Sequence, residues 1–199
     1  SEIVGENSLG TVTKVNYTHT DNATVKIAVV SGMHSRETLH KFILPLVCRI
    51  FALTHNDAEI VNYCVHVTDS PKDFNKGRAN GESLVHDYVV SDVAKLNPDL
   101  VIIGHDHEPS YGEGYYIATP TMDNASVDLA EEVTGDIGFN YYKRNKTFKG
   151  FLTQDSDAFT KGNGVLHNRI IRQSFFNLAI VPVHIKIRTP HIVPSLTVC

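Results

Sequence analysis

Hydrophobic residues in the first hundred positions fall into short runs, separated by longer segments in which apolar residues recur at helical spacing. Two of the runs, residues 27–30 and 100–103, are continuously apolar, which is typical of a strand that is covered on both faces in a parallel sheet. On this pattern we predict four strands, over residues 11–18, 25–31, 59–67 and 99–104.

Two longer segments predict helices. Residues 37–55 are rich in Leu, Ile and Phe, and Pro45 is expected to kink the helix that they form. A second helix is predicted over residues 81–96, and Asn97-Pro98 is expected to end it. The polar stretch before it, residues 68–78, is predicted to be a loop.

The alternation of strands and helices predicts an α/β fold, a three-layer sandwich with a mostly parallel central sheet. The chain has 199 residues, of which 42% are hydrophobic. A chain of this size and composition buries a substantial core, so we predict a single domain over residues 1–199.

Charge and cysteine content narrow the range of functions. The net charge of −4 arises from 18 basic and 22 acidic residues without a basic block, which argues against nucleic acid as a partner. The three cysteines form no CxxC pair and are odd in number, as expected in a reducing cytoplasm. Because no apolar run reaches the length of a membrane span and the N-terminus lacks a secretion signal, we expect a cytoplasmic protein that does not bind membranes.

Polar side chains follow three of the predicted strands, in each case at the carboxyl end. His34 and Glu37 follow the second strand, Asn75 and Arg78 follow the third, and His105 follows the fourth. Because ligand sites in parallel α/β sheets form at this edge, we expect the three loops to meet. Two imidazoles and one carboxylate suit Zn²⁺ and leave a fourth position for water, so the sequence predicts a hydrolytic metal site.

The same three segments are similar to those of a known family in their order and spacing. They read Gly-Met-His34-Ser-Arg-Glu37, Asp73-Phe-Asn75-Lys-Gly-Arg78 and Asp99-Leu-Val-Ile-Ile-Gly-His105. This series resembles the signature of the zinc carboxypeptidases and their relatives, the succinylglutamate desuccinylase and aspartoacylase group. The resemblance covers about residues 25–120 and does not extend to residues 121–199.

The resemblance implies a zinc-peptidase fold in which His34, Glu37 and His105 bind zinc. It also implies that Asn75 and Arg78 hold the carboxylate of a small molecule or short peptide, a role for which arginine offers two parallel hydrogen bonds. The implied reaction is hydrolysis of an amide bond next to a carboxylate, as in carboxypeptidases and N-acyl amino acid deacylases.

The chain departs from the family pattern at the substrate loop, at the general base and in its short length. The family's adjacent Asn and Arg are separated here by Lys76-Gly77, so either Gly77 bulges the loop and restores the geometry or Arg78 is unrelated. The family also carries a late glutamate that takes a proton from the zinc-bound water. No glutamate follows Glu132, and Arg188 stands about where the acid is expected.

A hydrolase therefore needs a general base from another part of the chain. We assign this catalytic role to Glu108, which lies three residues after His105, because a base must come within hydrogen-bond reach of the bound water. The other candidates are Glu113, Asp155 and Asp157.

Two other functions stay open on the sequence alone. Gly104-His-Asp-His107 matches the Gly-His-x-His end of calcineurin-like metallophosphoesterases, which bind two metals, but that family's earlier Asp-x-His, Gly-Asp and Gly-Asn-His motifs do not precede it. In this alternative His107 replaces His105 as a ligand. The missing glutamate supports the second alternative, a binding protein that keeps the zinc or carboxylate pocket and hydrolyses nothing.

Overall fold

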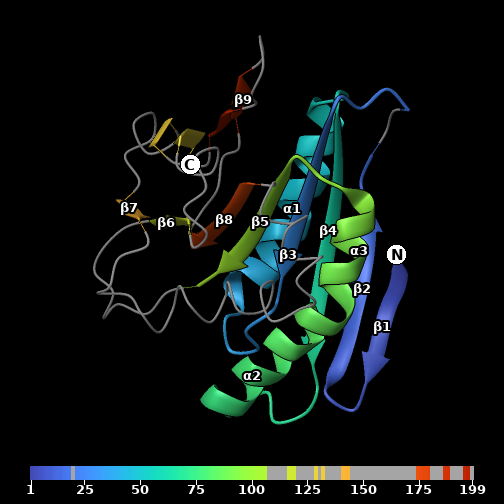
Figure 1. Ribbon diagram of the computed structural model, residues 1–199, viewed down its shortest axis with the longest axis vertical. Coiled ribbons are helices and arrows are strands. Elements are labelled where there is room, and N and C mark those ends of the chain that lie inside the picture. Colours follow the sequence, from blue (N-terminus) through green and yellow to red (C-terminus); the bar gives the residue numbers. More distant parts are fainter. Residues whose placement is uncertain are drawn as a thin grey trace.

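Eight strands form one open sheet in the computed structural model, in the order β1-β2-β4-β3-β5-β8-β6-β7, while β9 and β10 pair separately (Figure 1). The structure describes residues 1–18, 21–106, 128–129 and 131–132, together with the backbone of the later strands. The strands of the large sheet are β1 (Glu2–Asn7), β2 (Gly10–Asn16), β3 (Val25–Ser31), β4 (Ala58–Val67), β5 (Leu100–His105), β6 (Tyr116–Thr119), β7 (Asn140–Lys143) and β8 (Ser174–Ala179). The small pair consists of β9 (Lys186–Arg188) and β10 (Ser195–Thr197).

The sheet is mixed, and its central strands are parallel as the sequence predicts. Its centre is parallel, since β4, β3, β5 and β8 run in one direction. Antiparallel pairs flank this centre: β1 with β2 and β2 with β4 on one side, and β6 with β8 on the other. β1 and β2 are joined by a short turn, and so short a connection permits only antiparallel pairing.

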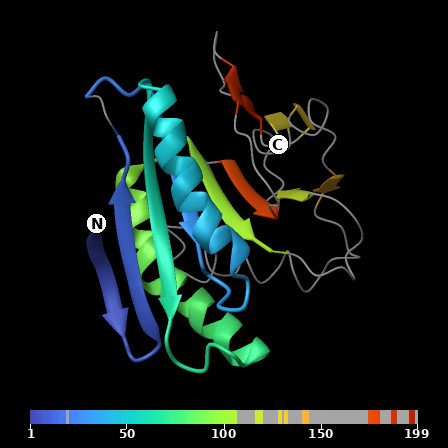
Figure 2. The ribbon, with the colours of Figure 1, turned by 180° about the vertical axis from the view of Figure 1, so that it is seen from behind.

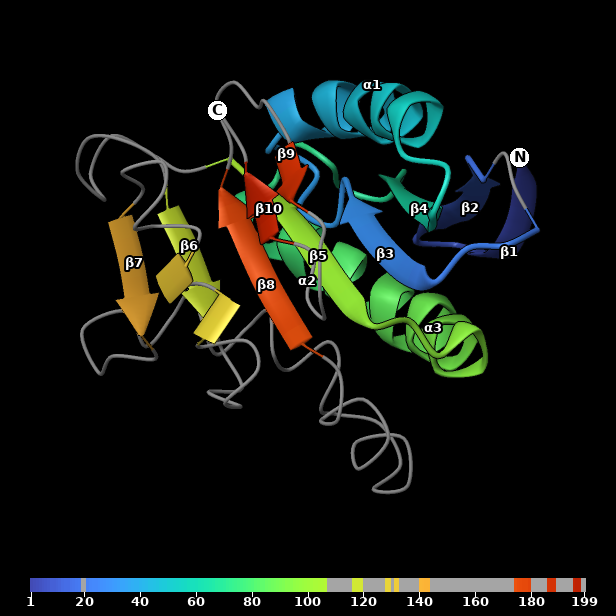
Figure 3. The ribbon, with the colours of Figure 1, turned by 90° about the horizontal axis from the view of Figure 1, so that it is seen from above.

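The four predicted strands are confirmed as β2, β3, β4 and β5, with small shifts at their ends. The two continuously apolar runs lie in β3 and β5, which are neighbours at the centre of the sheet, and every residue of β5 is buried. Helix α1 (Leu39–Thr54) lies over one face of this region (Figure 2), and helices α2 (Phe74–Leu84) and α3 (Val90–Leu96) lie over the other (Figure 3). Covering on both faces explains why these strands carry no polar alternation.

Helix α1 matches the helix predicted over residues 37–55 and contains Pro45, although it begins later, at Leu39. Within the described part of the chain, we find no helix whose length and apolar character would allow it to cross a bilayer.

The helix predicted from residue 81 begins earlier, at Phe74, so the prediction of a loop over residues 68–78 was wrong in its second half. Asp73 is the cause. Its carboxylate accepts hydrogen bonds from the backbone N–H groups of Asn75 at 3.0 Å and Lys76 at 2.8 Å, which satisfies two of the donors that a helix leaves open at its start. The chain then stays helical through a π-helical turn, Val85–Val89, into α3.

Gly77 therefore lies inside α2, and the proposed bulge that would restore the family's geometry does not exist. Gly77 and Gly81 are one helical turn apart and pack against the loop between β3 and α1. A Cβ atom at Gly77 would collide with the Ser35 hydroxyl, and one at Gly81 would overlap the carbonyl group of Met33. The two glycines thus allow the loop backbone to lie directly on the helix.

We predict that Gly81→Ala destabilises the protein by about 3 kcal/mol or more, because the added methyl group meets backbone atoms that cannot rotate away. Chemical denaturation measures the free energy of unfolding. Lys76→Ala, at an exposed position of the same helix, is the control and should change this free energy by less than about 0.5 kcal/mol. If both variants unfolded with the same free energy as the wild-type chain, the loop would not rest on α2.

Candidate metal centre

The loop after β3 places His34 and Glu37 side by side. The chain leaves β3 at Ser31 and turns at Gly32, whose φ of 79° lies in the left-handed region and whose Cα faces the Val65 carbonyl oxygen without room for a side chain. The backbone N–H of Glu37 then donates to the carbonyl oxygen of His34 at 3.0 Å. This turn brings the two side chains to the same side of the loop.

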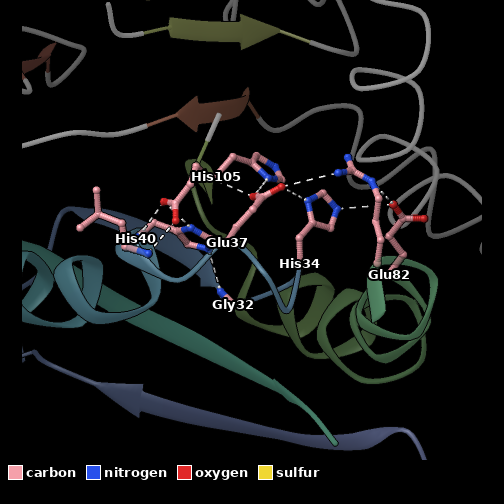
Figure 4. A network of polar contacts seen from close by, with 9 residues as sticks. Gly32, His34, Glu37, His40, Glu82 and His105 are labelled. Carbon is pink, nitrogen blue, oxygen red and sulfur yellow. Dashed lines mark hydrogen bonds and ion pairs between the residues drawn. The ribbon is translucent and has the colours of Figure 1, made fainter. Parts of the chain in front are cut away.

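The three residues that the sequence marks as ligands meet at the carboxyl ends of β3 and β5 (Figure 4). In Glu37, Oε1 lies 2.8 Å from Nδ1 of His34, and Oε2 lies 2.9 Å from Nδ1 of His105. One candidate ligand atom from each residue lies within 4.8 Å of the others. The two histidines are buried. The donor set and its convergence fit a metal ion, and metal binding itself stays a prediction.

Glu37 is held in its charged form. Burial by itself would raise the pKa of this carboxyl, but the charge and hydrogen bond of His105, and then those of His34, outweigh burial and hold the pKa far below its usual range. The backbone N–H of Asp106 donates a further hydrogen bond to Oε2 at 3.2 Å. A divalent cation likewise requires an ionised carboxylate, and on binding it would displace the imidazole protons that face Glu37.

Arg78 also reaches the cluster, from the buried side of α2. Its Nη1 lies 3.5 Å from Oε1 of Glu37, and its Nε lies 3.5 Å from Oε1 of Glu82. The same oxygen of Glu82 lies 3.4 Å from Nε2 of His34. Asn75 lies in the first turn of α2 with an exposed side chain, whereas the side chain of Arg78, three residues later, is buried.

Glu82 was missed by the sequence analysis. Its signal was the i,i+4 spacing to Arg78, which places both side chains on one face of a helix. That signal depended on recognising that α2 starts at Phe74, whereas Arg78 was assigned to a loop and Glu82 to the helix after it.

The sequence assigned no role in the site to His40 or Asp106, yet they tie the start of α1 to the end of β5. Asp106 accepts hydrogen bonds from the backbone N–H groups of Leu39 at 2.6 Å and His40 at 2.9 Å, and its Oδ1 lies 3.1 Å from Nδ1 of His40. The backbone N–H of Gly32 donates to Nε2 of His40 at 3.0 Å, which leaves the ring proton on Nδ1, facing Asp106. Burial lowers the pKa of His40. Through these hydrogen bonds, His40 and Asp106 fix the loops that carry the candidate ligands.

The candidate base and the alternative ligand lie outside the described residues. They are Glu108, Glu113, Asp155, Asp157 and His107. The position next to His105 on the sheet is described, because β8 pairs with β5 and sets Ala179 opposite His105. No Asp or Glu follows Asp157 in the chain, so the carboxyl end of β8 supplies no carboxylate to the site.

Comparison with known proteins finds a likeness in fold alone. No family model matches the chain, and no curated protein matches it. Among solved structures, it is similar to the apo structure of leucyl aminopeptidase from Trypanosoma brucei, with a TM-score of 0.54 and 9% sequence identity. The match covers 85% of this chain and 43% of the aminopeptidase, so this chain spans less than half of that protein's length.

Proposed function

We propose that this chain is a zinc-dependent hydrolase that cleaves an amide bond next to a carboxylate. The observation that carries the proposal is the meeting of two imidazole nitrogens, from His34 and His105, on the carboxylate of Glu37. Similarity in fold to an aminopeptidase supports a place among peptidase-like folds. We also propose that the chain forms one domain, a three-layer sandwich of the zinc-peptidase type. The helices on both faces of the central strands support this fold (Figure 3).

The charges around the site suit a divalent cation. Among the described residues, the carboxylates of Glu37, Glu82 and Asp106 lie within one cluster with a single guanidinium, that of Arg78. Two imidazoles and a carboxylate form a common zinc set, and zinc bound by three protein ligands lowers the pKa of a bound water to about 7. His34, Glu37 and His105 would hold the ion, and the buried strands behind them keep these ligands in place.

Arg78 is the group that we propose for the substrate's carboxylate. Its guanidinium lies 3.5 Å from a carboxylate oxygen of a candidate zinc ligand, so a substrate group held by Arg78 lies close to the ion. We propose that Asn75 assists from the first turn of α2. Small molecules or short peptides with a free carboxylate are the substrates that this arrangement suits.

Arg78→Lys is expected to lower kcat/KM on a carboxylate substrate by a factor equivalent to roughly 1.5 to 3 kcal/mol. Lysine keeps the positive charge beside Glu37 but loses the two parallel hydrogen bonds. With zinc in excess the content should therefore stay the same, and the loss should shrink on a matched substrate whose carboxylate is amidated. Unchanged kinetics on both substrates would remove Arg78 from substrate binding.

The proposal requires a general base, and we keep Glu108 in that role. Its support is its position three residues after His105. The competing function is a metal- or carboxylate-binding protein without hydrolytic activity, and the absence of an acid at the end of β8 favours it.

Two measurements on the purified chain test the function. Elemental analysis counts the metal: one zinc per chain supports the hydrolase, whereas two transition metals per chain favour the phosphoesterase. Turnover of a panel of N-acyl amino acids, short peptides and esters by the zinc-loaded chain then separates enzyme from binding protein. No turnover on any of them would leave the binding function as the better account.

A further inference from the structure

We infer that Glu82 is a positioning residue for the metal site: it holds the ring of His34 so that Nδ1 faces the ion. This inference rests on the proposed function and adds to it a residue from outside the ligand set. The ring of His34 lies between two carboxylates, with Nδ1 at 2.8 Å from Glu37 and Nε2 at 3.4 Å from Glu82 (Figure 4).

The orientation of the ring decides what Glu82 is able to do. Nδ1 of His34 and Nδ1 of His105 point at the same carboxylate, so Nδ1 is the nitrogen that would bind the ion. A neutral imidazole that binds through Nδ1 carries its proton on Nε2. That proton would lie on the side of the ring that faces Glu82, whose Oε1 is 3.4 Å from Nε2, so Glu82 would act through His34 and not as the general base.

Glu82 is itself fixed in place. Its side chain is 13% exposed, and a carboxylate so far from water requires a partner. Arg78 supplies it from one turn earlier on α2, with Nε at 3.5 Å from Glu82 and Nη1 at 3.5 Å from Glu37. One guanidinium therefore contacts both carboxylates that flank His34, and the i,i+4 spacing in α2 brings Arg78 to Glu82.

Close packing of α2 on the ligand loop makes this reach possible. Gly77 lets the Ser35 hydroxyl lie against the helix, and Gly81 does the same for the Met33 carbonyl group. Glu82 directly follows Gly81 in the same helix, so the same contact brings its carboxylate to His34. Carboxylates that accept from the second nitrogen of a metal-binding histidine orient the ring and raise its basicity, and their loss weakens metal affinity about 10- to 100-fold.

Zinc affinity of the metal-free chain, measured by competition with a chromophoric chelator, tests the inference without relying on activity. We expect Glu82→Ala to raise the zinc Kd by about 10- to 100-fold. Glu82→Gln should show a smaller rise, because an amide oxygen still accepts from Nε2–H but carries no charge. The matched control is Glu59→Gln. Glu59 is a partly buried glutamate near the amino end of β4, away from the site, and it pairs with Lys26 at 3.6 Å. Its loss should leave the Kd within about twofold.

A second readout separates positioning from a general loss of stability. In the zinc-loaded protein, ¹H–¹⁵N spectra of the histidine rings should show a proton on Nε2 of His34. Its resonance should shift or broaden by exchange in Glu82→Ala, while the ring signals of His105 keep their positions. A merely structural role would lower the unfolding midpoint of the metal-free chain and leave both the Kd and this resonance unchanged.

The outcomes are distinct from those of the proposed function. If the wild-type chain binds one zinc and the Kd values of Glu82→Ala and Glu82→Gln both lie within twofold of the wild-type Kd, the positioning role is overturned. The metal site itself is then retained. Wild-type chain that binds no zinc overturns both. Should Glu82→Ala fail to fold, Glu82→Leu, which is similar in size and accepts no hydrogen bond, decides, and an unchanged Kd in that variant is sufficient to reject the inference.

Discussion

His34→Ala, Glu37→Ala and His105→Ala are each expected to abolish stoichiometric zinc binding, with affinity weaker by on the order of 10³-fold or more. The reason is that a site with three protein ligands has no fourth side chain to replace a lost one. Both histidines contact the single carboxylate of Glu37, so each ligand is needed. Zinc is counted by elemental analysis after dialysis, and the Kd is measured by chelator competition.

His66→Ala is the matched control, because His66 is an exposed histidine of β4 and its loss should leave one zinc per chain. His107→Ala should also retain the metal if His105 is the ligand. Loss of zinc in His107→Ala with zinc retained in His105→Ala would show that the ligand set is wrong. Because Glu37 also pairs with Arg78, the isosteric Glu37→Gln serves as a second variant in which folding is least disturbed.

Glu108→Gln is expected to lower kcat by at least ~10²-fold while zinc content and stability stay unchanged. A general base within reach of the activated water contributes about 10²- to 10⁴-fold to the rate, and glutamine has the same shape without the ability to take a proton. Steady-state kinetics on the substrate with the highest turnover provide the measurement.

Glu113→Gln, in the same segment of the sequence, is the control and should retain full activity. Retained activity in Glu108→Gln would move the search for the base to Glu113, Asp155 and Asp157. A wild-type chain that is loaded with zinc and hydrolyses nothing would instead favour the binding protein.

The sequence by itself determined the central strands and the residues that converge at their ends. Strands buried on both faces need apolar side chains at every position, so β3 and β5 are visible as unbroken apolar runs. Parallel neighbours bring their carboxyl ends to one edge. The positions of His34, Glu37 and His105 just after those runs were therefore sufficient to predict that they lie together.

Only the tertiary structure decided where α2 begins and what surrounds the ligands. Asp73 is a common helix-capping residue, but the polar stretch around it carries equally strong loop signals, and the choice depends on how Gly77 and Gly81 pack on the ligand loop. The roles of Glu82 and Asp106 depend on contacts between segments far apart in the chain. A single sequence carries no local pattern for such contacts, since they arise from the packing of helices on the sheet.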